Sequence, residues 1–294
     1  MNDFSTVITI GNFDGVHIGH RHLISMTAEF ARRLAGRAVA ITFVPHPHQF
    51  FSPSPHFFLY PENVKERLLT EFGLDEVLYL PFDEICNLSP EDFFQSVLMP
   101  LEPAAIVLGE NFHFGAGKTG DINLLRELCA EKDVALHSLL MAPYKDEIVS
   151  SSRIRLALQA GNLVDANAML GEPYALYGRV EHGAGRGHTL GFATANIQAP
   201  DQVIPKIGAY ATRVQIDHSP DLLPAMTAVT QTPTFGAVQT VVETHILDFN
   251  EDIYGKSICI QFEERLRDEV IFISREALIR QLHEDCERVR KIKT

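Results

Sequence analysis

The feature that most constrains this chain is a ten-residue stretch at positions 11–20, with the sequence GNFDGVHIGH. It follows an apolar, β-rich run at 6–10 and precedes a helical pattern over about 21–34. The stretch is therefore predicted to be a tight loop between a strand and a helix. Backbone N–H groups and the helix dipole at such a position favour a bound phosphate.

Two histidines of this stretch, His17 and His20, lie three positions apart. Imidazoles on one side of the loop can donate to phosphate oxygens and to the charge that builds up during group transfer. The glycine spacing fits neither the Walker A pattern nor the dinucleotide fingerprint. The alternatives are that His17, His20 and His22 hold a transition metal, or that Asp14 only shapes a turn. No cysteine or carboxylate pattern nearby supports zinc.

Length and charge limit the classes of protein to consider. A chain of 294 residues suggests about two domains. A net charge of −13 argues against broad binding to nucleic acid or to an anionic membrane, so phosphate recognition must be local. The four cysteines form no Cys-x-x-Cys pair, and neither a signal peptide nor a membrane-length apolar run is present. We therefore expect a cytoplasmic protein with no nucleic-acid or membrane partner.

The first half alternates strand and helix patterns. Strands are predicted at 37–43, 77–80, 104–108 and 134–139, and helices at about 61–72, 90–98 and 121–131. This alternation predicts an α/β fold with a doubly wound parallel sheet. Ligands of such sheets lie at the carboxyl ends of the strands.

Three further segments carry ligand-binding residue types. Residues 45–48 form a proline-rich loop with His46, and the glycine-rich loop 109–121 carries Asn111 and rings that can stack on a planar ligand. Serines at 150–152 open a helical run, with Arg155 placed to reach a phosphate chain. The simpler alternatives are a rigid loop, a mobile loop, and a capping serine beside surface arginines.

From about residue 172 the hydrophobic period changes to two. Strands are predicted at 176–180, 209–214, 225–229, 240–247 and 257–262, followed by a helix over about 275–291. Strands with little helix between them indicate an antiparallel β-barrel with a terminal helix. We place the domain boundary there, giving domains 1–171 and 172–294. Arg265, Arg267 and Asp285 are expected to lie on the charged surface.

The stretch at 11–20 resembles the signature of the prokaryotic FAD synthetase family, whose members are bifunctional riboflavin kinases and FMN adenylyltransferases. The patterns at 43–47, 109–121 and 150–155 also resemble motifs of that family. The resemblance implies a nucleotidyltransferase-like domain that joins FMN to the AMP part of ATP and releases pyrophosphate. It implies His17 and His20 as catalytic residues. The substrate-binding residues that it implies are Gly11, Phe13, Asp14, Gly19, His46, Asn111, Phe112, Phe114, Ser151, Ser152 and Arg155.

The second half resembles riboflavin kinases, which have a six-stranded barrel and a terminal helix. The resemblance implies that Thr194 binds Mg²⁺ with ATP and that Glu243 is the base for the riboflavin hydroxyl. Gly187, Gly191, Asn196 and Thr234 would bind substrate. The partners implied are riboflavin, FMN and ATP, and FMN and FAD are the products.

The sequence departs from the kinase pattern at three places. Ala193 replaces a usual proline, His188 replaces a common arginine, and Ala228–Thr230 replaces Asn-Ile-Gly. One alternative is therefore an FMN adenylyltransferase whose degenerate barrel only holds flavin. Another is a flavin-binding regulator without turnover.

Overall fold

The computed structural model describes residues 5–182, 192–198, 201–217, 219–234 and 237–292. Its contacts divide the chain into two compact units. The first comprises 1–54 and 62–150, and the second comprises 55–61 and 151–294. Each unit is described by itself.

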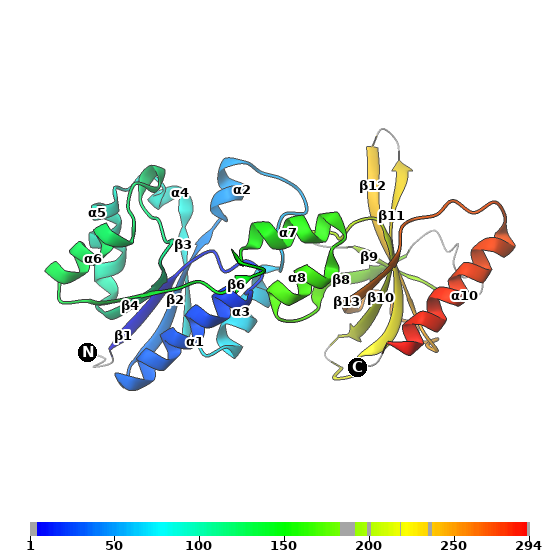
Figure 1. Ribbon diagram of the computed structural model, residues 1–294, viewed down its shortest axis with the longest axis horizontal. Coiled ribbons are helices and arrows are strands. Elements are labelled where there is room, and N and C mark those ends of the chain that lie inside the picture. The colour runs from blue at the N-terminus through cyan, green and yellow to red at the C-terminus, as the bar shows by residue number, and fades with distance from the viewer. Residues whose placement is uncertain (1–4, 183–191, 199–200, 218, 235–236, 293–294) are drawn as a thin grey trace. The chain divides into compact units, whose positions relative to one another are not determined.

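The first unit is built on a five-stranded parallel sheet with the order β3-β2-β1-β4-β5 (Figure 1). The strands are β1 (Thr6–Ile10), β2 (Arg37–Val44), β3 (Glu76–Pro81), β4 (Pro103–Gly109) and β5 (Ala135–Leu139). This order confirms the doubly wound prediction and places the topological switch point between β1 and β4. The loops that leave β1 and β4 therefore start side by side.

Helices lie on both faces of this sheet. They are α1 (Ile18–Arg33), α2 (Pro47–Phe51), α3 (Glu62–Glu71), α4 (Phe82–Ile85), α5 (Pro90–Phe93) and α6 (Ile122–Glu131), with a π-helical turn (Phe94–Leu98), two 3₁₀ turns (Met99–Leu101 and Ala116–Lys118) and a small hairpin of β6 (Pro143–Tyr144) and β7 (Glu147–Ile148). The side chains of Ser89 and Asp121 accept backbone N–H bonds at the starts of α5 and α6, as the sequence predicts. Ile8, Ile106 and other strand residues pack on α5 and α6 to form the core.

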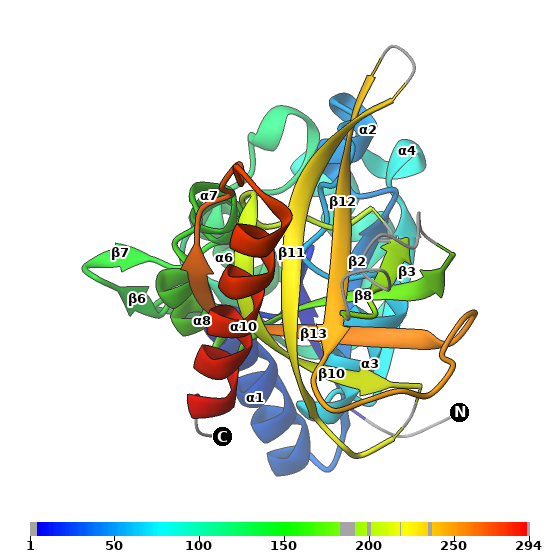
Figure 2. The same cartoon turned by 90° about the vertical axis from the view of Figure 1, so that its right-hand side faces the viewer.

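The second unit is a closed antiparallel barrel with the order β10-β11-β12-β9-β8-β13. Its elements are α7 (Ser151–Ala160), α8 (Leu163–Leu170), β8 (Tyr174–Glu181), β9 (Ala195–Gln198), β10 (Gly208–Ile216), β11 (Leu223–Thr234), β12 (Ala237–Ile246), β13 (Ser257–Arg267) and α10 (Arg275–Lys291). The terminal helix α10 packs on β10 and β11 (Figure 2). The barrel with its terminal helix is thus confirmed. The period-two pattern did not include its sixth strand, β9.

A segment that we call the strap, Pro55–Pro61, lies between β2 and β3 in the sequence but packs in the second unit. Phe58 forms a parallel β-bridge with Gln202. Gln202 is fully buried, donates to the Leu59 carbonyl at 2.9 Å and accepts from the Tyr177 amide at 2.9 Å. The Tyr60 ring stacks on that of Tyr174. The strap is therefore an integral part of the second unit.

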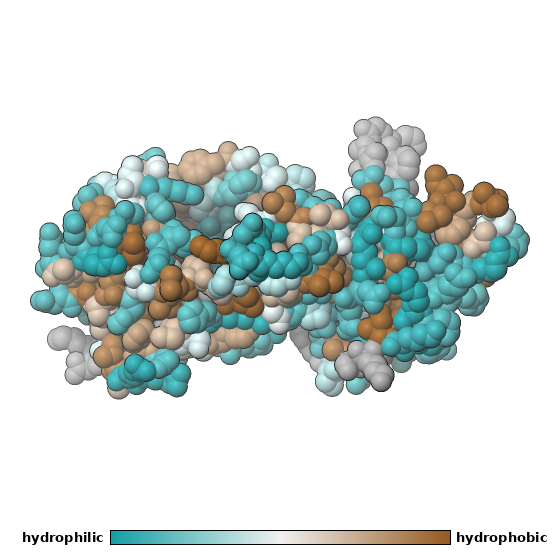
Figure 3. Space-filling view, in the orientation of Figure 1, coloured by the Kyte–Doolittle hydropathy of each residue, from teal (hydrophilic) through white to brown (hydrophobic). Residues whose placement is uncertain are grey.

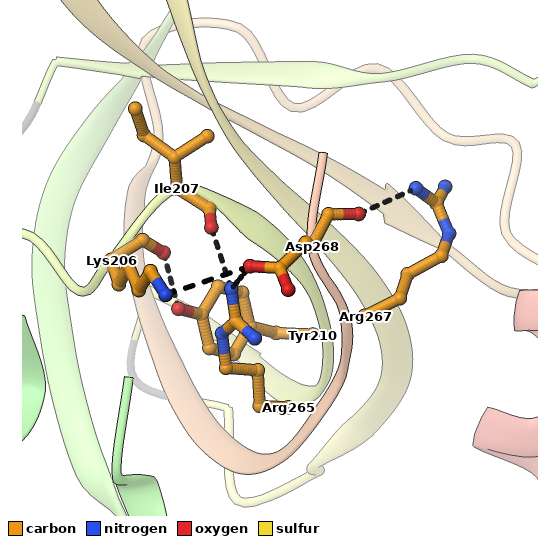
Figure 4. A network of polar contacts seen from close by, with 6 residues as sticks. All are labelled: Lys206, Ile207, Tyr210, Arg265, Arg267 and Asp268. Atoms are coloured by element: carbon orange, nitrogen blue, oxygen red, sulfur yellow. Dashed lines mark hydrogen bonds and ion pairs between the residues drawn. The ribbon is translucent and has the colours of Figure 1, made fainter. Parts of the chain in front are cut away.

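Arg265 is at the centre of a polar network at one end of the barrel (Figure 4). Its Nη2 donates to the Ile207 carbonyl at 2.8 Å and to Asp268 at 2.7 Å. The Tyr210 hydroxyl donates to the Lys206 carbonyl. The side chain of Arg265 is only 18% exposed, so the prediction that Arg265 is an ordinary surface residue is wrong.

Arg267 and Asp285 also depart from their predicted surface positions. Asp285 on α10 is fully buried and accepts from Arg267 Nε at 2.9 Å and from Gln281 at 3.1 Å. A buried carboxylate needs such partners because it has lost its water. This pair therefore anchors α10 to β13. The segment just before α10 leaves Ile271 and Ile273 almost fully exposed, and apolar colour gathers beside the start of that helix (Figure 3).

Asp285→Ala should lower the unfolding free energy of the barrel by about 3 kcal/mol, because Arg267 keeps a half-buried charge without a partner. Asp248→Asn is the matched control, since Asp248 also pairs with α10, through Arg290, but is exposed, and asparagine tolerates the positive φ at this position. It should leave stability nearly unchanged. Urea unfolding followed by tyrosine fluorescence measures both, because the chain has no tryptophan. Equal losses would contradict the anchoring role.

Candidate active sites

The turn after β1 holds the first candidate site. Helix α1 begins at Ile18, three residues before its predicted start, so His20 lies in its first turn. His17 is the N-cap, and its Nδ1 accepts the His20 amide at 3.3 Å. Phe13 and Val16 adopt positive φ, which produces the sharp turn. The predicted strand, loop and helix are all present, and His17 is the residue that begins the helix.

The two imidazoles of this turn stack face to face. The ring centroids of His17 and His20 are 3.6 Å apart, and the ring planes differ by 16°. A Cβ at Gly19 would lie 3.3 Å from the His17 ring, so a glycine there gives the ring its space. The lone pair of a ring nitrogen lies in the plane of its ring, so the lone pairs of two stacked rings do not converge on one metal ion. The geometry therefore gives no support to a metal held by His17, His20 and His22.

Burial keeps both imidazoles neutral at pH 7. His17 is 2% exposed, and desolvation lowers its pKa to about 4. Desolvation lowers the pKa of His20 well below its usual range, and repulsion from His17, when that ring is protonated, and from the Lys65 ammonium acts in the same direction. Because Nδ1 of His17 accepts a bond, its proton is on Nε2. His17 is thus an N–H donor without a charge.

Several polar atoms around this turn have no partner in the part of the chain that the structure describes. They are the buried Oγ1 of Thr9, Oδ1 of Asn12 and Nδ1 of His20. Buried polar atoms in native proteins nearly always have partners, and exceptions indicate a functional site or a missing ligand. These atoms lie at the carboxyl end of β1, where ligands bind in this type of sheet.

The loop after β4 starts beside this turn, because β1 and β4 are paired. Asn111 is exposed and Phe112 is half-buried, which leaves both available to a ligand. Phe114 is buried against Phe93 in the core, and Phe13 is fully buried edge-on to His20. These two rings are therefore part of the core and do not present a face on which a ligand could stack.

The segment 45–48 was predicted to be a rigid loop, but a short helix, α2, begins at Pro47. His46 is its N-cap, and its Nδ1 accepts the His48 amide at 3.1 Å. A nearby surface hollow of about 430 Å³ contains no residue of the 11–20 turn, and its lining is Val44, Glu62, Glu66, Tyr79 and Pro81. The hollow is therefore distinct from the turn at 11–20.

Ser151, Ser152 and Arg155 belong to α7 and are grouped with the second unit. The Nε of Arg155 donates to the Phe57 carbonyl at 2.8 Å, and the guanidinium lies 3.9 Å from the centre of the Phe57 ring. Arg155 thus contacts the strap. Its role toward a phosphate chain stays a prediction.

The barrel holds the second candidate site. Asn196 on β9 lies directly opposite Glu243 on β12, and opposite Glu181 on β8. Thr194 lies two residues before Asn196. Cross-strand partners share a face of the sheet, so the structure brings the predicted base beside a predicted phosphate ligand. Gly187, Gly191 and His188 lie outside the described residues, as does the side chain of Thr234.

His245 is a residue of this site that the sequence reasoning missed. It lies two positions after Glu243, on the same face of β12, and its Nδ1 bonds to the Ala193 carbonyl at 2.8 Å. Its ring packs edge-on against Phe192. The bond restrains the backbone where alanine replaces the usual proline, next to Thr194. The sequence did contain a signal for His245, because residues two positions apart on a predicted strand lie on the same face as each other.

Comparison with known proteins also gives two parts of the chain, each matched by a different family model. The sequence model described as FAD synthetase matches residues 1–153, and that described as riboflavin kinase matches residues 170–293. A bifunctional riboflavin kinase/FMN adenylyltransferase from Escherichia coli K12 is 35% identical over 283 residues, which cover 95% of this chain and 90% of that protein. The chain belongs to this bifunctional family.

Other relatives extend the comparison. The protein of the same name from Listeria monocytogenes is 32% identical over 96% of this chain and 91% of its own length. A solved structure from Streptococcus pneumoniae, titled a macrolide-efflux protein, superimposes with a TM-score of 0.91 at 29% identity, covering 100% of this chain and 96% of that one. Within the described ranges, no helix is long and apolar enough to span a bilayer.

His17→Asn should remove a pH-dependent part of stability. Folded His17 stays neutral to about pH 4, whereas unfolded histidine takes up a proton near pH 6.5. The wild type therefore has this stability in full above pH 6.5 and loses it as the pH falls toward 4. Between pH 8 and pH 6 it should lose about 1 kcal/mol more than the variant. Urea titrations at both values, above the pI of 5.4, measure the difference.

Asparagine is chosen for this variant because it still caps the helix. His22→Asn, at an exposed position, is the control and should follow the wild type. A His17→Asn curve parallel to the wild type would contradict a buried neutral imidazole.

His245→Ala should lower riboflavin phosphorylation at least about tenfold and raise the KM for ATP, because the Ala193 backbone loses its restraint. His245→Asn places a donor near the former Nδ1 and should recover part of the loss. Steady-state assays with riboflavin measure this, and adenylylation of supplied FMN by the other unit is the internal control. An equal loss of both activities would indicate a folding defect.

Proposed function

We infer that this chain phosphorylates riboflavin to FMN with ATP and then adenylylates FMN to FAD with a second ATP. The observation that carries the inference is that each family match coincides with a fold and a site suited to one of these steps. The parallel sheet presents a helix N-terminus and neutral imidazoles, and the barrel presents Glu243 beside Asn196. The activity of the family relatives is the same pair of reactions by name.

For adenylyl transfer, the FMN phosphate oxygen attacks the α-phosphorus of ATP, and the bond to pyrophosphate breaks. No covalent enzyme intermediate is needed, so the protein positions and neutralises the reactants. We propose that the first amides of α1 and the Nε2–H of His17 donate to the phosphate chain, with His20 beside them. Gly11, Asp14, Gly19, His46 and Asn111 remain proposed substrate contacts of this step. Ser151, Ser152 and Arg155 remain residues that we expect to bind the phosphate chain.

For the kinase step, Glu243 would accept the proton of the riboflavin hydroxyl as the hydroxyl oxygen attacks the γ-phosphorus of ATP, and the bond from that phosphorus to ADP breaks. The hydroxyl of Thr194 and the amide oxygen of Asn196 are hard donors that suit Mg²⁺, which keeps several waters. Mg²⁺ bound with ATP would supply charge neutralisation on the phosphates. Gly187, Gly191 and Thr234 remain proposed substrate contacts.

The proposed functional domains are 1–171 for adenylyl transfer and 172–294 for phosphorylation. The family matches at 1–153 and 170–293 support this division. We further propose that the enzyme acts in the cytoplasm, where its four free cysteines would stay reduced.

The alternative of a degenerate barrel is not favoured. The pairing of Asn196 with Glu243 is present, and His245 holds the carbonyl of Ala193 at the position of the lost proline. The departure at Ala193 is therefore compatible with Glu243 as the proposed base and Asn196 as the proposed phosphate ligand.

Two variants separate the two steps. His20→Ala should abolish FAD formation from FMN and ATP while FMN formation from riboflavin continues. Glu243→Gln should abolish FMN formation from riboflavin while FAD formation from supplied FMN continues. Chromatographic separation of riboflavin, FMN and FAD after incubation with ATP and Mg²⁺ measures both. A wild type that makes FAD only from supplied FMN would support the degenerate barrel, and one that makes neither product would support the regulator.

A further inference from the structure

Lys65 is a charged residue in an unusual place. It is the fourth residue of α3 and is only 7% exposed. Lysines are almost never buried to this extent without a partner. Across the described residues, Lys65 makes no hydrogen bond or ion pair, and its Nζ lies 5.4 Å from the centre of the Tyr79 ring. The side chain thus holds an ammonium with little water and no direct counter-ion.

This placement is costly for the free protein. Burial lowers the pKa of Lys65, and the nearby carboxylates of Glu62, Asp14 and Glu66 offset that effect only in part. The N-terminal end of a helix also carries a positive partial charge, which repels a cation. Packing alone would be served better by an uncharged side chain of the same length, such as methionine.

The surroundings of Lys65 indicate what compensates this cost. Its charge lowers the pKa of His20, and the Asp14 carboxylate raises the pKa of Lys65, so the ammonium is within electrostatic reach of the turn between β1 and α1. The same turn contains the buried, unpaired Asn12 Oδ1 and His20 Nδ1. The stacked imidazoles there are neutral and supply no positive charge. Arg21 of α1 is a cation at this turn, but its Nε donates to the Val16 carbonyl at 2.9 Å and its guanidinium lies over the Phe72 ring. Lys65 of α3 is a nearby cation whose ammonium makes no hydrogen bond or ion pair among the described residues, so α3 supplies a charge with which a polyanion at this turn can pair.

We propose that Lys65 is a phosphate-binding residue of the adenylyltransferase site, whose ammonium pairs with the phosphate groups of the substrates and has no counter-ion until they bind. The proposal rests on adenylyl transfer being the reaction of the first unit. Lys65 exchanges no proton in the step. It compensates negative charge on oxygen, while the bond from the flavin phosphate forms and the bond to pyrophosphate breaks.

The test compares Lys65→Met, Lys65→Arg and the control Lys132→Met in the full-length chain. Lys132 is exposed at the end of α6 in the same unit. Lys65→Met should melt at the same temperature as the wild type or higher when no substrate is present, because an unpaired buried charge is gone. It should also lose most of the stabilisation that pyrophosphate gives to the wild type, and lower kcat/KM for FAD formation about tenfold or more. FMN formation from riboflavin should not change.

Lys65→Arg should retain part of the activity, and Lys132→Met should match the wild type throughout. Two sources of phosphate are distinguished by the kinetics. A raised KM for ATP with weaker pyrophosphate binding assigns Lys65 to the nucleotide chain, whereas a raised KM for FMN alone assigns it to the flavin phosphate.

A Lys65→Met variant that unfolds, or melts well below the wild type, would overturn the proposal and make Lys65 a structural counter-ion for Asp14. Unchanged FAD formation and pyrophosphate binding in a folded variant would overturn it as well. A wild type that makes no FAD from FMN and ATP would instead overturn the proposed function of the unit.

Discussion

Burial of polar groups beside the first turn of α1 is the constraint on which the first unit depends. Asp14 and His17 are each 2% exposed, so these groups must find their partners within the protein or in a ligand. The turn that holds them joins the central strand to a helix that packs on β1, β2 and β4. The position of the proposed catalytic histidines is therefore fixed by the buried core, and the positive φ of Phe13 and Val16 is held by that packing.

Much of the first unit was readable from the sequence because the apolar strands and the amphipathic helices differ sharply in period. The start of α1 was missed because its cap is His17, which is outside the usual set of capping residues. The rings of Phe13 and Phe114 were expected to be available to a ligand, since sequence does not show which face of a loop packs inward. The burial of Lys65 was equally hidden, because it depends on how α3 packs against elements such as β3 and not on the local sequence pattern.

The barrel shows the same limit. Its strands were predicted from their alternation, but β9 is only four residues long and is placed by its pairing with β8 and β12. Arg267 and Asp285 are 18 positions apart, and no local pattern reveals that they meet. The proximity of Asn196 and Glu243 likewise depends on the register between strands. Family motifs named these two residues, but only the register shows that they share one face.

The strap has a consequence for how the protein is made. The Leu59 carbonyl accepts its hydrogen bond from Gln202, which lies 143 residues further along the chain. A ribosome adding about 5–20 residues per second needs roughly ten seconds to cover that distance. During that interval the nascent chain carries Phe57, Phe58 and Tyr60 without their final cover, and the strands β3, β4 and β5 of the parallel sheet are synthesised before it ends. The N-terminal half therefore leaves the ribosome with an exposed aromatic segment that only the later half can bury. We expect a chaperone that binds apolar segments to bind the nascent chain at this stage.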